Sequence, residues 1–269
     1  MRILVGTPCA MGVVHSQYLT SFLATFNGVT QHKQQVANQL VQQYPGGFNQ
    51  NDKNHVAGLN QALHQHTLDV GLYTLAGESL LGRGRNHIAA QCLIGGWDKL
   101  IFIDSDGGWS YEDFKAIVNS PHPIIGGVVP LKAYVNSPHG FQTSLNYLPF
   151  LEDEVHFQNG IRDLAGTEKM VKAHGSHIVR VAFTGTAFLS ISREVLMKMA
   201  ETAQEYLYPD PHTGQSAVHW SFFDGGPIND TYNSEDWSFC HKARELGYDI
   251  HIDTNVRLSH TGNHTFRAG

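Results

Sequence analysis

The amino-acid sequence predicts an α/β fold with a mostly parallel central sheet that helices cover on both faces. In the first half of the chain, short apolar segments typical of buried strands alternate with segments whose apolar residues recur at helical spacing. The 269 residues are 41% hydrophobic and 16% charged, the composition of a globular protein with a large core. There is no internal repeat, and we expect one domain, with halves of about 1–130 and 131–269.

The first half supplies most of the expected strands. "RILVG" reads as the first strand, and a Gly/Pro turn then leads to a helix from about Val14 to Phe26. Residues 28–67 are rich in Gln, His and Asn, which predicts a polar surface insertion, part helix and part loop. The expected elements that follow are a strand in "LDVGLYTL", a helix in "ESLLGRGRNHIAAQCLIGG", a strand in "KLIFID", a helix in "YEDFKAIVNS" and a strand in "PIIGGVVP".

The second half is less regular. "EDEVHFQNGIRDL" and "TEKMVKAHG" are expected to form loops or an edge hairpin. One or two strands around Gly185 and a helix in "REVLMKMAETA" come next. "NSEDWSFCHKARELGY" predicts a helix with Ser234 as its N-cap and Gly247 past its end, and "DIHIDTNVRLSHTG" predicts a closing strand and turn.

Composition narrows the class of protein. Eighteen Lys and Arg against 24 Asp and Glu give a net charge of −6, which excludes a generally basic nucleic-acid surface. The sequence contains no apolar run long enough to span a bilayer, and its N-terminal apolar run is shorter than that of a signal peptide, so we expect a cytoplasmic protein. Cys9, Cys92 and Cys240 are widely spaced and are expected to be small core residues.

The segment "DKLIFIDSDGGW" carries the clearest chemical signal. An apolar strand ends there in two carboxylates, Asp104 and Asp106, which repel each other unless a positive charge lies between them. Together they could hold a hard cation such as Mg²⁺ or Mn²⁺ and the phosphate oxygens of a substrate. The alternative is an ordinary Asp- and Gly-rich turn after a strand.

Three further features of the sequence support a metal and phosphate site at Asp104 and Asp106. Arg83 and Arg85 lie next to Asn86 at a helix start, where guanidinium groups and backbone N–H groups suit a phosphate. Two acids open a later helix, where they could also simply complement the helix dipole. A late "LSHTG" presents a histidine in a turn bounded by glycine.

In this order the motifs resemble the GT-A glycosyltransferases: a first strand with a Thr-Pro turn, the "RGRN" helix, a strand ending in D-x-D, the "GTAFLSISREVL" segment, an E-D helix and a late His-x-Gly. The likeness covers nearly the whole chain outside the insertion. It is closest to small soluble glycosyltransferase-like proteins of bacteriophages and large viruses, and more distant to fungal mannan-polymerase-type enzymes. It implies a Rossmann-like fold, a nucleotide-sugar half and an acceptor half, and, for a viral protein, the host cytoplasm.

The resemblance also implies roles for individual residues. Asp106 would chelate Mn²⁺ or Mg²⁺ at the diphosphate of a nucleotide sugar, Asp104 would share the metal or touch the ribose, and His260 would complete the metal shell. Asp236, with Glu235 beside it, would be the catalytic acid: a general base in inverting enzymes, a positioning group in retaining ones. Contacts to the donor are implied for Thr7, Pro8, Arg83, Arg85, Asn86, Ser105, Thr184, Gly185 and Thr186.

The sequence therefore predicts a metal-dependent glycosyltransferase with a UDP- or GDP-sugar donor. The acceptor hydroxyl could belong to a glycan, a protein or a hydroxymethylated base of phage DNA, although the negative net charge disfavours DNA. A metal-dependent nucleotidyltransferase is an alternative, but "GTPCAMGVVHS" lacks the basic residues expected after its first strand. A noncatalytic sugar-binding or structural protein is another, and it would be expected to lose the metal ligands. Trp109, Trp220, Phe222 and Phe223 are candidates for stacking on a sugar or base, or for packing in the core.

Overall fold

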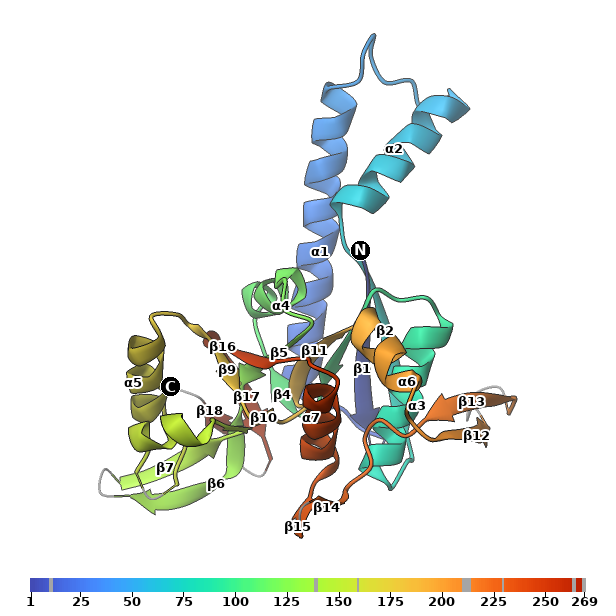
Figure 1. The fold of residues 1–269 in the computed structure, drawn as a ribbon. Helices are drawn as coiled ribbons and strands as arrows, with labels where there is room; N and C mark the ends of the chain where they lie inside the picture. The colour runs from blue at the N-terminus through green and yellow to red at the C-terminus, as the bar shows by residue number, and fades with distance from the viewer. Residues whose placement is uncertain are drawn as a thin grey trace.

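A seven-stranded sheet forms the centre of the computed structural model, which describes residues 1–9, 12–137, 140–158, 160–209, 214–228, 230–262 and 265–267. Five strands run parallel, and only β11 and β9 run against them. The expected α/β fold with a mainly parallel sheet is confirmed (Figure 1). In sheet order the strands are β2 (Asp69–Ala76), β1 (Arg2–Cys9), β3 (Lys99–Ile103), β11 (Phe188–Ser192), β5 (Ile124–Val128), β16 (Ile250–Arg257) and β9 (Ile178–Val181).

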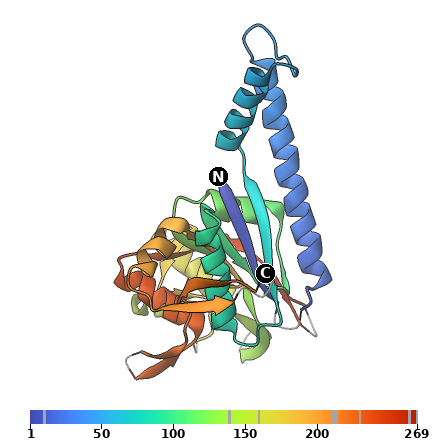
Figure 2. The ribbon, with the colours of Figure 1, turned by 90° about the vertical axis from the view of Figure 1, so that its right-hand side faces the viewer.

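Helices cover both faces of this sheet, because its strands bury side chains on both sides. In β1, Leu4 belongs to one core and its neighbours Ile3 and Val5 belong to the other. Helices α3, α6 and α7 supply the first core, and α1 and α4 the second. Figure 2 shows β1 and β2 with α1 on one side and α3 on the other. The helices are α1 (Ser16–Gln42), α2 (Lys53–His66), α3 (Leu81–Ile94), α4 (Tyr111–Asn119), α5 (Leu164–His174), α6 (Arg193–Ala200) and α7 (Glu235–Glu245).

Several short strands pair outside the central sheet, and some of them lie at the edge where its parallel strands end. The most important group is β4 (Gly107–Gly108), β17 (Ser259–Thr261) and β18 (Thr265–Arg267), which pair as β18-β17-β4. This small sheet joins the end of the chain to the turn that follows β3. The remaining pairs are β6 (Pro130–Ser137) with β7 (Gly140–Leu145), β8 (Tyr147–Leu148) with β10 (Phe183–Thr184), β12 (Glu205–Pro209) with β13 (Ser216–Trp220), and β14 (Gly226–Ile228) with β15 (Thr231–Asn233).

The polar insertion is more helical than the sequence suggests. Helix α1 does not end near Phe26 but continues to Gln42, and α2 returns beside it after a short loop. The two helices project from the body as a hairpin (Figures 1 and 2). Tyr44, Phe48 and His55 pack together where the hairpin turns. No helix in the described parts of the chain combines the length and the apolar character needed to cross a membrane.

The second half contains a helix that the sequence analysis missed. Residues 151–156, in one of the two segments expected to be loops or an edge hairpin, form a 3₁₀ helix, and α5 occupies 164–174 in the other. Asp163 caps α5 by accepting a hydrogen bond from Gly166 N at 2.8 Å, and Gly175 ends it in the left-handed conformation. Both capping signals are present in the sequence, but only a few apolar residues mark the helix between them.

The aromatic candidates mostly belong to the core. Trp109, Phe222 and Phe223 are buried, and Trp220 packs partly buried against the same core as the two phenylalanines. The indole N–H of Trp109 donates to Thr25 Oγ1 at 2.9 Å. Core packing therefore explains these rings. The three cysteines are also buried, as expected: Cys9, Cys92 and Cys240.

Gly6 in β1 is expected to tolerate no side chain, because a Cβ there would lie 2.3 Å from Cγ2 of Ile88 in α3. Ile88 is β-branched and fully buried, so it cannot rotate away freely. We expect Gly6→Ala to lower the free energy of unfolding by about 2 kcal/mol through overpacking. Urea unfolding measures this loss. Gly226→Ala is the matched control, since a Cβ there meets no atom within 4 Å, and its effect should stay within about 0.5 kcal/mol. Equal effects of the two substitutions would contradict the proposed clash.

Candidate functional site

The candidate site lies at the edge where the parallel strands end. Asp104 and Asp106 follow β3, Pro130 follows β5, and His260 follows β16. The carboxyl ends of parallel strands meet at one edge of a sheet, which is where α/β proteins bind ligands. Asp106 and His260, which are 154 residues apart in the sequence, therefore meet at this edge.

The turn after β3 presents the two carboxylates. Gly107 N donates to Asp104 O at 3.0 Å, which closes a tight turn around Ser105. A Cβ at Gly108 would lie 2.3 Å from Nε2 of Gln17, so a side chain there would displace the Gln17 side chain of α1. Glycine at position 108 thus leaves room for the Gln17 side chain of α1 beside the turn.

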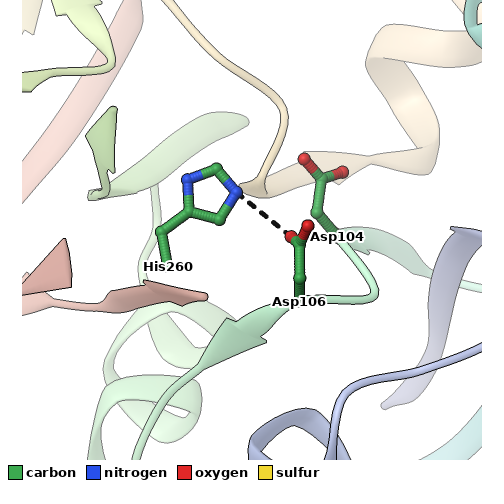
Figure 3. A group of neighbouring side chains, drawn as sticks. All are labelled: Asp104, Asp106 and His260. Carbon is green, nitrogen blue, oxygen red and sulfur yellow. Dashed lines mark hydrogen bonds and ion pairs between the residues drawn. The ribbon is translucent and has the colours of Figure 1, made fainter. Parts of the chain in front are cut away.

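His260 completes a group of three possible metal ligands. In strand pairing His260 lies opposite Gly107, and Thr261 N donates to Asp106 O at 2.9 Å, so the register of β17 on β4 fixes the histidine beside the aspartates. One ligand atom from each of Asp104, Asp106 and His260 lies within 4.8 Å of the others. Figure 3 shows the imidazole turned toward Asp106 with Asp104 beside it.

The hydrogen bonds of His260 fit a cation. Its Nδ1 lies 2.9 Å from Pro130 O, which can only accept, so Nδ1 carries a proton. Its Nε2 lies 3.1 Å from Asp106 Oδ1. Nε2 is thus the ring nitrogen that faces the carboxylate and could share a metal ion with it. Two carboxylates and one imidazole form a donor set that could bind a divalent metal ion.

Asp106 is the most strongly paired acid of the group. Besides His260, the ammonium of Lys132 in β6 donates to its Oδ2. Burial raises the pKa of Asp106, but the hydrogen bonds and charges of His260 and Lys132 outweigh burial and lower the pKa to about 2. Asp106 is therefore ionised at neutral pH and available to a metal. The sequence analysis did not single out Lys132, because nothing in "VPLKAY" distinguishes it from a surface lysine.

Arg85 links Asp104 to helix α7. Its guanidinium is buried and donates through Nη2 to Asp104 Oδ1 at 3.3 Å and through Nη1 to Glu235 Oε1. Arg83, by contrast, pairs with Glu78, at 2.7 Å from its Nε to Oε2. Of the two predicted arginines, Arg85 therefore contacts acids of the candidate site, and Arg83 instead pairs with Glu78.

Asp236 lies beside Glu235 and faces the glycine of the "FTGTAF" segment. Its Oδ1 accepts hydrogen bonds from Ser234 Oγ and from Trp237 N, and a Cβ at Gly185 would lie 3.4 Å from its Oδ2. Burial raises the pKa of Asp236, Glu235 adds to the rise, and Ser234 and Arg85 oppose it. Ser234 is the N-cap residue of α7 as expected, but its side chain binds Asp236 and does not cap the backbone.

Several other predicted residues have partners within the chain. Asn86 accepts from Phe222 N and Phe223 N and donates to Asp224, so it holds the loop after β13. Thr7 Oγ1 forms a 2.5 Å hydrogen bond with Tyr18 OH inside the core. Of the remaining predicted contacts, Thr184 and Thr186 are buried, with hydroxyls that have no hydrogen-bond partner among the described residues, and Pro8 and Ser105 are partly buried.

Comparisons with known proteins give a distant likeness in structure. No protein-family model matches the chain, and no curated protein matches its sequence. A crystal structure of A197 from STIV is similar at 13% identity and a TM-score of 0.45, over 97% of this chain and 86% of that one. UDP-glucose pyrophosphorylase complexed with UDP-glucose is similar at 9% identity and a TM-score of 0.34, over 94% and 90% of the two chains. At these values neither likeness assigns a function to this chain.

The ion pairs of Asp106 predict a specific loss of stability in acid. A carboxyl whose pKa is about 2 when folded and near 3.8 when unfolded stabilises the fold above pH 4, and this contribution disappears as the pH falls toward 2. Between pH 4 and pH 2, the wild type should therefore lose about 2 kcal/mol more unfolding free energy than Asp106→Asn. Urea unfolding in EDTA at each pH measures the difference. The exposed Asp69→Asn variant should follow the wild type, and parallel curves for Asp106→Asn and wild type would exclude the ion pairs.

Proposed function

We propose that this chain is a metal-dependent glycosyltransferase, which moves a sugar from a UDP- or GDP-sugar to an acceptor hydroxyl. One observation carries the proposal: the buried guanidinium of Arg85 binds both Asp104, in the candidate metal group, and Glu235, next to Asp236. The candidate metal group and the carboxylate that could activate a hydroxyl therefore lie on either side of the Arg85 side chain. A turn with acidic residues and no function would not require this arrangement.

Three residues would hold the metal. Asp106 would supply an ionised oxygen, Asp104 a second carboxylate and His260 the Nε2 lone pair that its Nδ1 hydrogen bond to Pro130 O orients. When bound, a divalent cation stabilises the negative charge that develops on a departing nucleoside diphosphate. No acid near the leaving oxygen is then needed.

Asp236 would handle the proton of the acceptor. In an inverting reaction its Oδ2 takes the hydroxyl proton while the hydroxyl oxygen bonds to the anomeric carbon. The bond from that carbon to the diphosphate oxygen breaks, and its electron pair leaves with the nucleoside diphosphate. The raised pKa of Asp236 makes it a stronger base than an exposed aspartate. In a retaining reaction the same carboxylate would orient the acceptor or the sugar.

Gly185 would form the floor beneath the reacting groups. A side chain at this position would meet Asn146 Nδ2 at 3.1 Å and Asp236 Oδ2 at 3.4 Å, so glycine keeps the approach to the carboxylate open. The acceptor would be a glycan, a protein or a hydroxymethylated base of DNA.

A thermal-shift panel tests the donor class. UDP-, GDP-, CDP- and ADP-sugars are added with Mn²⁺ and, separately, with EDTA. A ligand that binds only the native state raises the melting temperature, so we expect a metal-dependent rise for a UDP- or GDP-sugar. Asp106→Ala should remove this rise while the protein stays folded, and Asp69→Ala, at an exposed position on β2, should keep it. A full rise in Asp106→Ala would exclude the metal group.

Asp236→Asn tests the proton-transfer role. With an acceptor in hand, we expect transfer to fall by a factor of about 10² or more, because amide nitrogen and oxygen cannot take the hydroxyl proton. Donor binding in the thermal-shift assay should remain close to that of the wild type. Equal losses of donor binding and transfer would indicate a structural role for Asp236. The released product also separates the reaction types, since a nucleotidyltransferase forms pyrophosphate and a glycosyltransferase forms a nucleoside diphosphate.

A further inference from the structure

Lys132 places a positive charge beside Asp106, one of the three possible metal ligands. It follows β5 by four residues, and its ammonium donates to Asp106 Oδ2, the oxygen that does not face His260. Its side chain is 37% exposed, so water and a ligand can reach it. The lysine and the histidine thus approach the same carboxylate, each at its own oxygen.

The local backbone directs Lys132 toward the site. The register of β6 on β7 is irregular between Pro130 and Tyr134, so Lys132 lies in the irregular stretch and not in the regular ladder. Such irregularities re-aim side chains and are common beside functional sites. The stem of Lys132 lies along Gly262, where a Cβ would contact its Cδ at 3.5 Å. The Lys132 stem therefore passes within van der Waals reach of the His-x-Gly turn.

The negative charges of the site are only partly neutralised without a metal. Asp104, Asp106 and Glu235 face two permanent cations, Arg85 and Lys132. A divalent cation at Asp106 would lie close to the Lys132 ammonium, and the two positive charges would repel each other. A diphosphate brings several negative oxygens, which could pair with both cations and remove the repulsion.

We propose that Lys132 is a donor-binding residue, whose ammonium neutralises Asp106 before the substrate arrives and binds the diphosphate together with the metal afterwards. This inference rests on the proposed function. Its consequence is a coupling: Lys132 weakens the binding of the metal alone and strengthens the binding of the nucleoside diphosphate with metal. The metal and the donor then bind cooperatively, and a bare metal ion is bound poorly.

Two titrations test the coupling on the full chain. Mn²⁺ alone is titrated into wild type and Lys132→Met, and then UDP and GDP are titrated at saturating Mn²⁺, with calorimetry as the readout. We expect Lys132→Met to bind Mn²⁺ alone about fivefold or more tighter, and the preferred nucleoside diphosphate about fivefold or more weaker, in the usual range of coupling between two ligands. Lys132→Arg, which keeps the charge, should change both affinities less than Lys132→Met does.

The matched control is Lys198→Met, which removes one positive charge from a lysine that pairs with Glu201 on the surface. It should leave both affinities unchanged. Opposite shifts in Lys132→Met support the proposal, because a loss of local structure would weaken both ligands. Unchanged affinities, or a decrease in both, overturn it.

Failure of the underlying function gives a different pattern. If the wild type binds Mn²⁺ with a diphosphate, and Asp106→Ala does not, the proposed function stands whatever Lys132→Met does. If the wild type binds neither Mn²⁺ nor either diphosphate, the proposed function and the role of Lys132 both fall.

Discussion

The buried guanidinium of Arg85 is the interaction on which the candidate site depends. A buried cation is costly unless anions satisfy it, and Arg85 has two: Asp104 at the end of β3 and Glu235 at the start of α7. Its rigid fork fixes the angle between them, which a lysine could not do. Helix α3 carries Arg85 to this position because α3 packs into the core on the same face of the sheet as α7. The core thus sets the distance between the two acidic segments.

The electrostatics of the acids then follow from their partners. Asp106 and Asp236 are both partly buried, which raises the pKa of each. For Asp106 the hydrogen bonds of His260 and Lys132 reverse this effect, whereas Asp236 has the hydrogen bond of Ser234 and the charge of Arg85, with Glu235 acting against them. One fold therefore shifts the pKa values of two carboxyl groups in opposite directions.

The acids of the candidate site could be predicted from the sequence, but their partners could not. Strand ends and helix starts are local features, so Asp104, Asp106 and Asp236 could be found from "IFIDSD" and "NSEDW" alone. Lys132 could not, since its contact with Asp106 depends on tertiary structure and on the irregular register of β6. Arg83 and Arg85 look equivalent in "GRGRN", and only the tertiary packing gives one to Glu78 and the other to the site. The missed helix α5 shows the same limit, since few apolar residues mark it.

The projecting hairpin is tied to this site through the first turns of α1. Gln17 donates to Ser259 and accepts from Thr261 Oγ1 at 2.7 Å, so it holds the strand that carries His260. One turn further on, Ser21 accepts from Trp109 N at 3.0 Å, directly after β4. The two residues that hold β17 and β4, Gln17 and Ser21, belong to the same continuous helix that extends outward to Gln42. The insertion is therefore an extension of an element that the site needs, and a change in the tilt of α1 would move β4 and β17 together.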